Sequence, residues 1–259
     1  MFFLLFLKQC GEGLSPFYLV SGSDNTKRPV MPLLYIIFAY YYLGLLLSCF
    51  LTGCLFVRKS WSLEYKLLVI LSGLTLLAET GAYLYATLRI DGHWVHNLFA
   101  PVECVFILYI LHRASMRPAI KRLNIVLLVI LPAGIGVIYG LHPAVLRIGE
   151  FAALFYLFLE LTAACSFLID LVLNKSDTPV GRQPLFWMAA GMLFYCSIFS
   201  MELTVMSFIK KIPWQYSVSY AIVANTFMYT GFITCFICLH RANPASRGDS
   251  PTYPEVLRP

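Results

Sequence analysis

The sequence predicts an all-α, polytopic membrane protein, folded as a bundle of seven transmembrane helices. Of the 259 residues, 59% are hydrophobic and 12% are charged, whereas a soluble domain has about 45–50% apolar and about 25% charged residues. The mean hydropathy is +0.76. The apolar residues also lie in long runs, each close to the ~20 residues that a helix needs to cross a bilayer.

Seven runs are long and apolar enough to be spans. Their expected bounds are 33–57, 67–88, 98–113, 123–140, 151–173, 185–208 and 217–239. Asn97 is expected to cap the short third run, because its side chain can accept a backbone N–H of the first helical turn. His93 and His96 would then lie in the preceding loop.

The seven runs form one expected domain, residues 31–240. Residues 1–30 are interpreted as an N-terminal extension that is either flexible or the result of a start site assigned too early. Residues 241–259 are rich in Pro, Ser and Arg, which predicts a disordered cytoplasmic tail.

Lysine and arginine between the runs predict the orientation, since such residues are enriched on the cytoplasmic side. The richer side carries Arg58, Lys59, Lys66, Arg113, Arg117, Lys121, Arg122, Lys175, Arg182, Arg241, Arg247 and Arg258. We therefore expect a cell-membrane protein (inner or plasma membrane) with its N-terminus outside and its C-terminus in the cytoplasm. Basic residues scattered between apolar runs also argue against a nucleic-acid partner.

Acidic residues inside the runs are the strongest functional signal, because an ionisable group in a membrane is costly. Counting ~1.5 Å per residue from the outer helix ends, Glu103 and Glu202 are roughly 8 Å deep. Glu79, Glu160 and Asn225 are roughly 13 Å deep on the same count. Asp170 lies near the cytoplasmic end of its run and can reach the interface.

The sequence thus predicts an outward-facing acidic pocket that binds a cation, a proton or a polar ligand. Further candidates for its lining are Tyr83, Tyr195 and Asn97. The alternative is that protonated acids form hydrogen bonds between helices and only hold the bundle together.

Metal and catalytic motifs are weak. His93 and His96 could join Glu103 in a metal site, but no HExxH or intramembrane HxxxH accompanies them. The chain has no GxSxG, no phosphate-binding loop and no GxGxxG, and the last run has no lysine for a retinal Schiff base. We expect no cofactor, and the lack of a nucleophile–base pair argues against an enzyme.

Two stretches carry a resemblance to a group of proteins. One is Asn97-Leu-Phe-Ala-Pro-Val-Glu103 with Phe106 and Tyr109; the other is Pro184-Leu-Phe-Trp187 with Gly191, Tyr195, Asn225 and Tyr229. Over residues 33–240 the chain resembles uncharacterised bacterial seven-helix membrane proteins, often encoded near signal-transduction genes.

The resemblance implies a sensory or receptor-like module. A ligand would bias the packing of the last three spans, and a cytoplasmic signalling partner would read the change at the basic loop 113–122. That loop could instead only set the topology and contact anionic lipids. The alternative functions are a small-solute or proton-coupled transporter, or a lipid-modifying enzyme that uses the intramembrane glutamates.

Overall fold

The fold is all-helical, as the sequence predicted. The computed structural model describes residues 33–57, 61–88, 93–141, 150–174, 179–208 and 214–242. These contain the helices α3 (Leu33–Phe56), α4 (Leu63–Thr87), α5 (His93–Ala114), α6 (Pro118–Leu141), α7 (Glu150–Leu173), α8 (Pro184–Phe208) and α9 (Trp214–Arg241), with a short 3-10 helix η1 (Val180–Arg182) before α8. Within the described residues, α3, α4, α6, α7, α8 and α9 are long and apolar enough to cross a membrane, which indicates a multi-pass membrane protein.

Several helices begin earlier than the sequence predicted. Because α5 starts at His93, Asn97 lies one turn inside it, and the prediction that Asn97 caps the helix is wrong. His93 and His96 belong to the helix rather than to a loop. In an apolar medium, a backbone N–H group outside a helix has no water with which to form a hydrogen bond. Helices therefore continue past residues that would start them in water.

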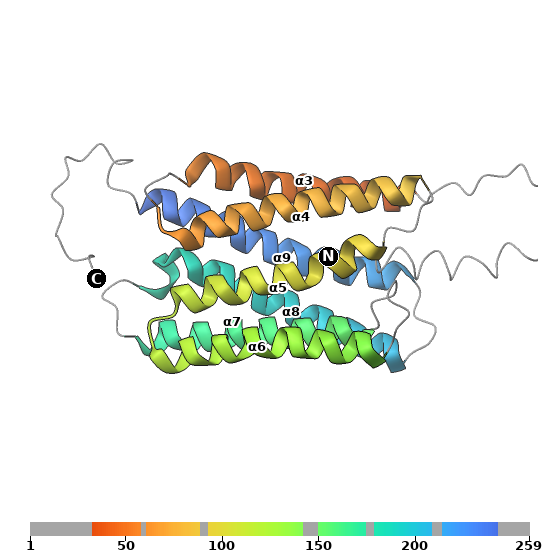
Figure 1. Ribbon diagram of the computed structural model, residues 1–259. Helices are drawn as coiled ribbons and strands as arrows, with labels where there is room; N and C mark the ends of the chain where they lie inside the picture. Colours follow the sequence, from red (N-terminus) through yellow and green to blue (C-terminus); the bar gives the residue numbers. More distant parts are fainter. Residues whose placement is uncertain are drawn as a thin grey trace, which may run out of the picture.

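The helices pack as a ring. Contacts lead from α4 to α3, α9, α8, α7 and α5 and back to α4, while α6 packs on the outside against α5 and α7. In Figure 1, α3 and α4 form one side of the bundle and α6 and α7 the opposite side. Successive helices alternate in direction, so the C-terminal ends of α3, α5, α7 and α9 lie at one end of the bundle (Figure 1).

This end of the bundle is basic. Every lysine and arginine within the described ranges lies there, namely Lys66, Arg113, Arg117, Lys121, Arg122, Arg182 and Arg241. We call it the basic end. The described parts of the other end carry none; Arg89, Arg147, Lys210 and Lys211 are not among the described residues.

The outer surface of the ring is suited to lipid. Large apolar side chains point outward, with Leu55 76% exposed, Leu77 71% and Val172 68%. Exposed hydroxyl groups are satisfied within their own helices, each donating to the carbonyl oxygen four residues earlier at 2.6–2.8 Å; they are Ser48, Thr52, Thr162, Thr204 and Thr234. Because of this internal bonding, these five hydroxyl groups do not need water.

Helices α8 and α9 approach closely enough that their backbones touch. A Cβ atom added to Gly231 would lie 2.5 Å from the carbonyl oxygen of Trp187. A Cβ atom on Gly191 would lie 2.9 Å from the carbonyl oxygen of Phe227. Small residues at a helix crossing permit this packing in membranes, so α8 and α9 form the tightest pair of the ring.

We predict that Gly231→Ala destabilises the bundle by about 1–3 kcal/mol, because the added methyl group meets backbone that cannot move aside. Gly136→Ala is the matched control, since nothing lies within 4 Å of a Cβ atom there. Thermal unfolding of the purified proteins in detergent checks this. Equal melting temperatures for the two variants would contradict the close α8–α9 contact.

Candidate functional site

The four glutamates that the sequence singled out are all buried inside the bundle. Glu79 is 2% exposed, Glu103 and Glu160 are 5% exposed, and Glu202 is 7% exposed. They come from α4, α5, α7 and α8, respectively. Because these fractions include no lipid, burial here means that each carboxyl group faces neighbouring helices rather than the membrane.

Three of these acids lie within electrostatic range of one another. The carboxyl group of Glu103 interacts with that of Glu79 and with that of Glu160. Since α5 begins at His93, Glu103 is ten residues, or about 15 Å, from its helix start, deeper than the sequence predicted. Glu160 is also ten residues from the start of α7. Earlier helix starts therefore bring these two acids to a common level.

Tyrosine side chains from three further helices complete the group. Tyr195 of α8 and Tyr229 of α9 both interact electrostatically with Glu103. The hydroxyl oxygens of Tyr229 and Tyr42 of α3 are 3.4 Å apart, and Tyr42 also interacts with Glu79. Every helix of the ring thus contributes at least one of these six residues, which we call the axial cluster: Tyr42, Glu79, Glu103, Glu160, Tyr195 and Tyr229.

Two cysteines border the axial cluster on one side. The thiol of Cys196 on α8 donates to a carboxylate oxygen of Glu160, with sulfur and oxygen 3.8 Å apart. Cys104, next to Glu103 on α5, interacts with both Glu103 and Glu160. A metal site formed by three or more His, Cys, Asp or Glu side chains is nevertheless not found among the residues described.

The remaining candidates lie apart from the axial cluster or at its margin. Glu202 is two turns, or about 10 Å, along α8 from Tyr195, toward the end opposite the basic end. The side-chain amide of Asn225 donates to the carbonyl oxygen of Ala221 at 2.8 Å, one turn from Tyr229. Tyr83 interacts with the hydroxyl group of Tyr40 on α3.

The side chains of Asn97, His93 and His96 lie outside the described part of the structure. A role for Asn97 in the pocket, and a metal site at the two histidines, therefore stay predictions.

The charge balance at the axial cluster is one-sided. Three carboxyl groups lie together there, and the buried side chains of the described residues include no lysine, arginine or histidine. Negative charges close to one another in a protein interior repel each other strongly. Protons or a positively charged partner relieve this repulsion.

Asp170 has a different role, at the basic end of α7. One carboxylate oxygen accepts the backbone N–H groups of Met116 and Arg117 at 2.7 and 3.3 Å. The other lies 3.6 Å from Nε of Arg117, and that guanidinium group also donates to the carbonyl oxygen of Leu173. From the sequence we expected Asp170 to reach the membrane interface. In the structure its side chain is almost fully buried and holds the turn between α5 and α6.

Sequence reasoning missed Tyr42, Cys104 and Cys196, and noted Tyr229 only within the resemblance. One feature of the sequence could have indicated the two cysteines. Cys104 directly follows Glu103 and Cys196 directly follows Tyr195, each inside an otherwise apolar run. Tyr42 is one of three consecutive tyrosines. Which of the three tyrosines faces inward depends on the rotation of α3 about its axis. That rotation cannot be predicted from the sequence, because α3 is apolar on all sides.

Comparisons of this chain with protein-family models, with curated proteins and with solved structures found no match. The resemblance to bacterial seven-helix proteins therefore stays a prediction.

We predict that Asp170→Ala lowers the stability of the bundle by about 1–3 kcal/mol, because it removes the acceptor of two backbone N–H groups. Glu64→Ala is the control: Glu64 pairs with half-exposed Arg113 at 3.2 Å, and such an ion pair is worth about 0–1 kcal/mol. Limited proteolysis at the α5–α6 turn, together with thermal unfolding, measures both. Unchanged cleavage and melting in Asp170→Ala would show that the turn does not depend on this carboxylate.

Proposed function

We propose that the chain is a seven-span, receptor-like protein of the cell membrane whose axial cluster binds a small cation or protons. The observation that carries this proposal is the gathering of Glu79, Glu103 and Glu160 in the interior without a buried basic side chain among the described residues. A cation that enters this cluster relieves the repulsion between the carboxylates.

The seventh span in this proposal is α5. Its 22 residues correspond to about 33 Å of helix, enough for a hydrocarbon core of about 30 Å. It runs alongside α4 and α6 over most of its length (Figure 1). Its one acidic residue, Glu103, is buried and faces the neighbouring helices.

The basic end is placed in the cytoplasm by the positive-inside rule. The axial cluster then lies near the middle of the bundle, with Glu202 between it and the outside. The C-terminus follows the basic end of α9 and is cytoplasmic in this orientation.

A receptor-like role is favoured over transport or lipid chemistry by the position of α7. This helix carries Glu160 in the axial cluster and, ten residues or about 15 Å further along, Asp170. Asp170 in turn holds the turn at residues 115–117. The rest of the predicted basic loop 113–122 is helical and belongs to the ends of α5 and α6. A shift of α7 on ligand binding would therefore reach the basic segment at which we expect a cytoplasmic signalling partner, with Arg117 as the connecting residue.

Cysteine labelling tests the seventh span. Leu88 follows α4 and is 68% exposed, and Met116 follows α5 and is 59% exposed. We predict that a membrane-impermeant maleimide labels Leu88→Cys in intact cells, whereas Met116→Cys reacts only after permeabilisation; wild type gives the background from native cysteines. Labelling of both variants from the same side would contradict a spanning α5.

Cation binding is tested by melting temperatures in detergent at increasing Na⁺, Ca²⁺ or methylammonium. A ligand at 100 times its dissociation constant stabilises the folded state by about 2.7 kcal/mol. We predict a saturable rise in wild type with at least one of these cations. Glu103→Gln and Glu160→Gln should lose the rise, because each replaces a carboxyl group that can ionise and bind the cation by a neutral amide.

Glu64→Gln is the matched control and keeps the cation-dependent rise, since Glu64 lies at the basic end beside Arg113. If no cation shifts wild type, or if Glu103→Gln and Glu160→Gln respond as wild type does, the binding proposal fails. If the variants lose cation flux into liposomes but show no saturable stabilisation, the protein is a transporter instead.

A further inference from the structure

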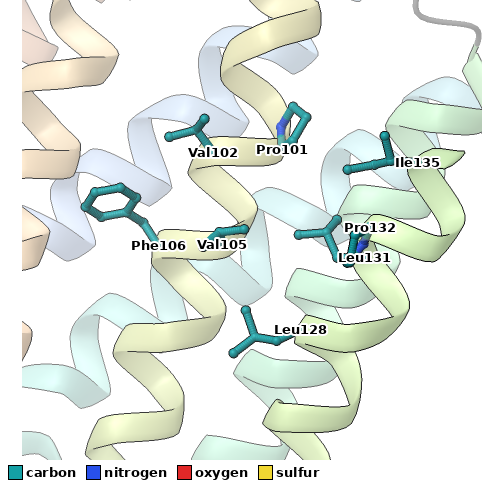
Figure 2. Close-up of a pocket in the computed structure, with 8 residues that line it drawn as sticks. All are labelled: Pro101, Val102, Val105, Phe106, Leu128, Leu131, Pro132 and Ile135. Atoms are coloured by element: carbon teal, nitrogen blue, oxygen red, sulfur yellow. The ribbon is translucent and has the colours of Figure 1, made fainter. Parts of the chain in front are cut away.

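An apolar groove lies on the outside of the ring, between α5 and α6. It has a volume of about 420 Å³ and is lined by Pro101, Val102, Val105, Phe106, Leu128, Leu131, Pro132 and Ile135. Figure 2 shows Pro101 and Val105 on α5 facing Leu128, Leu131 and Ile135 on α6 across the gap. The lining contains no charged or hydrogen-bonding side chain, so any occupant must be hydrocarbon.

Two prolines make this groove. Pro101 and Pro132 both lie inside helices, where proline removes one backbone hydrogen bond and its ring displaces the preceding turn. Because both rings border the groove, α5 and α6 do not close on each other at this level. The gap is thus built into the sequence of both helices.

The depth of the groove determines what surrounds it. On α6 its residues begin ten positions after the helix start at Pro118, or about 15 Å along a helix that crosses a core of about 30 Å. Val102 is 37% exposed and Val105 is 43% exposed, so the groove opens sideways. At the middle of a bilayer, the medium that reaches such an opening consists of acyl chains.

The length of the groove suits a single acyl chain. The groove extends over the eight residues from Leu128 to Ile135 of α6, a rise of about 10 Å, or nearly two helical turns. An acyl chain that lies along it contacts apolar side chains of both helices.

We propose that the α5–α6 groove is a binding site for one acyl chain of a membrane lipid. The site is separate from the axial cluster, because Pro101 and Glu103 point from opposite sides of α5, toward α6 and toward the ring interior respectively. The proposal therefore does not depend on cation binding. It does place the chain against the turn of α5 that carries Glu103, so an occupied groove fixes the position of that turn.

Photolabelling tests the site. The full-length protein is reconstituted in phosphatidylcholine vesicles that contain a phosphatidylcholine with a diazirine at the middle of one acyl chain, then irradiated and mapped by mass spectrometry. We expect adducts on Val105, Leu128 and Pro132 to be severalfold more frequent than on Val126 and Val129. These two control residues are 51% and 65% exposed on α6 but lie outside the groove.

Filling the groove should abolish the preference. Val105→Phe is expected to reduce adducts on Leu128 to the level at Val129, whereas Val129→Phe, the matched control, leaves them unchanged. The ratio in wild type is decisive even if Val105→Phe fails to fold. Equal labelling at groove and control residues would mean ordinary surrounding lipid and would overturn the proposal, as would cross-links between two copies of the chain through the groove.

Discussion

The structure depends on one constraint: three carboxyl groups are buried together at the centre of a membrane bundle. Glu79, Glu103 and Glu160 come from three different helices and meet tyrosines from the other three helices of the ring. Removing each ionised carboxyl group from water costs a large desolvation free energy, and the repulsion between the carboxylates increases that cost. A bundle that is apolar outside and acidic inside keeps this arrangement only if something neutralises the charge, which is why we place the function there.

The packing of the ring protects this interior from both sides. At one flank, Gly191 and Gly231 let the backbones of α8 and α9 touch, so that Tyr195 and Tyr229 are held on a tight pair. At the basic end, Asp170 fastens α7 to the turn after α5. Helices α5 and α7, which carry Glu103 and Glu160, are thereby joined at the basic end. A shift of α7 in response to a ligand is expected to move the turn after α5 with it.

The long apolar helices could be predicted from the sequence because lipid imposes a simple rule on length and composition. The acids could be identified because a charge inside an apolar run is conspicuous. Asn97 was misassigned as a cap because capping preferences describe helices whose ends meet water, and α5 instead continues from His93. That error made Glu103 seem as shallow as Glu202. The inward rotation of Tyr42 and Cys196 could not be predicted, since both helices are apolar on all sides.

Infrared spectroscopy of the carboxyl C=O stretch tests the central claim most directly. Wild-type protein in lipid, without added metal ion or amine, should show bands of buried protonated carboxylic acids, and these should decrease when a cation that stabilises the protein is added. The same bands should be reduced in Glu103→Gln and Glu160→Gln. If the bands are absent, or are identical in wild type and in both variants, the carboxyl groups are not neutralised as we describe and the axial cluster has no cation to bind.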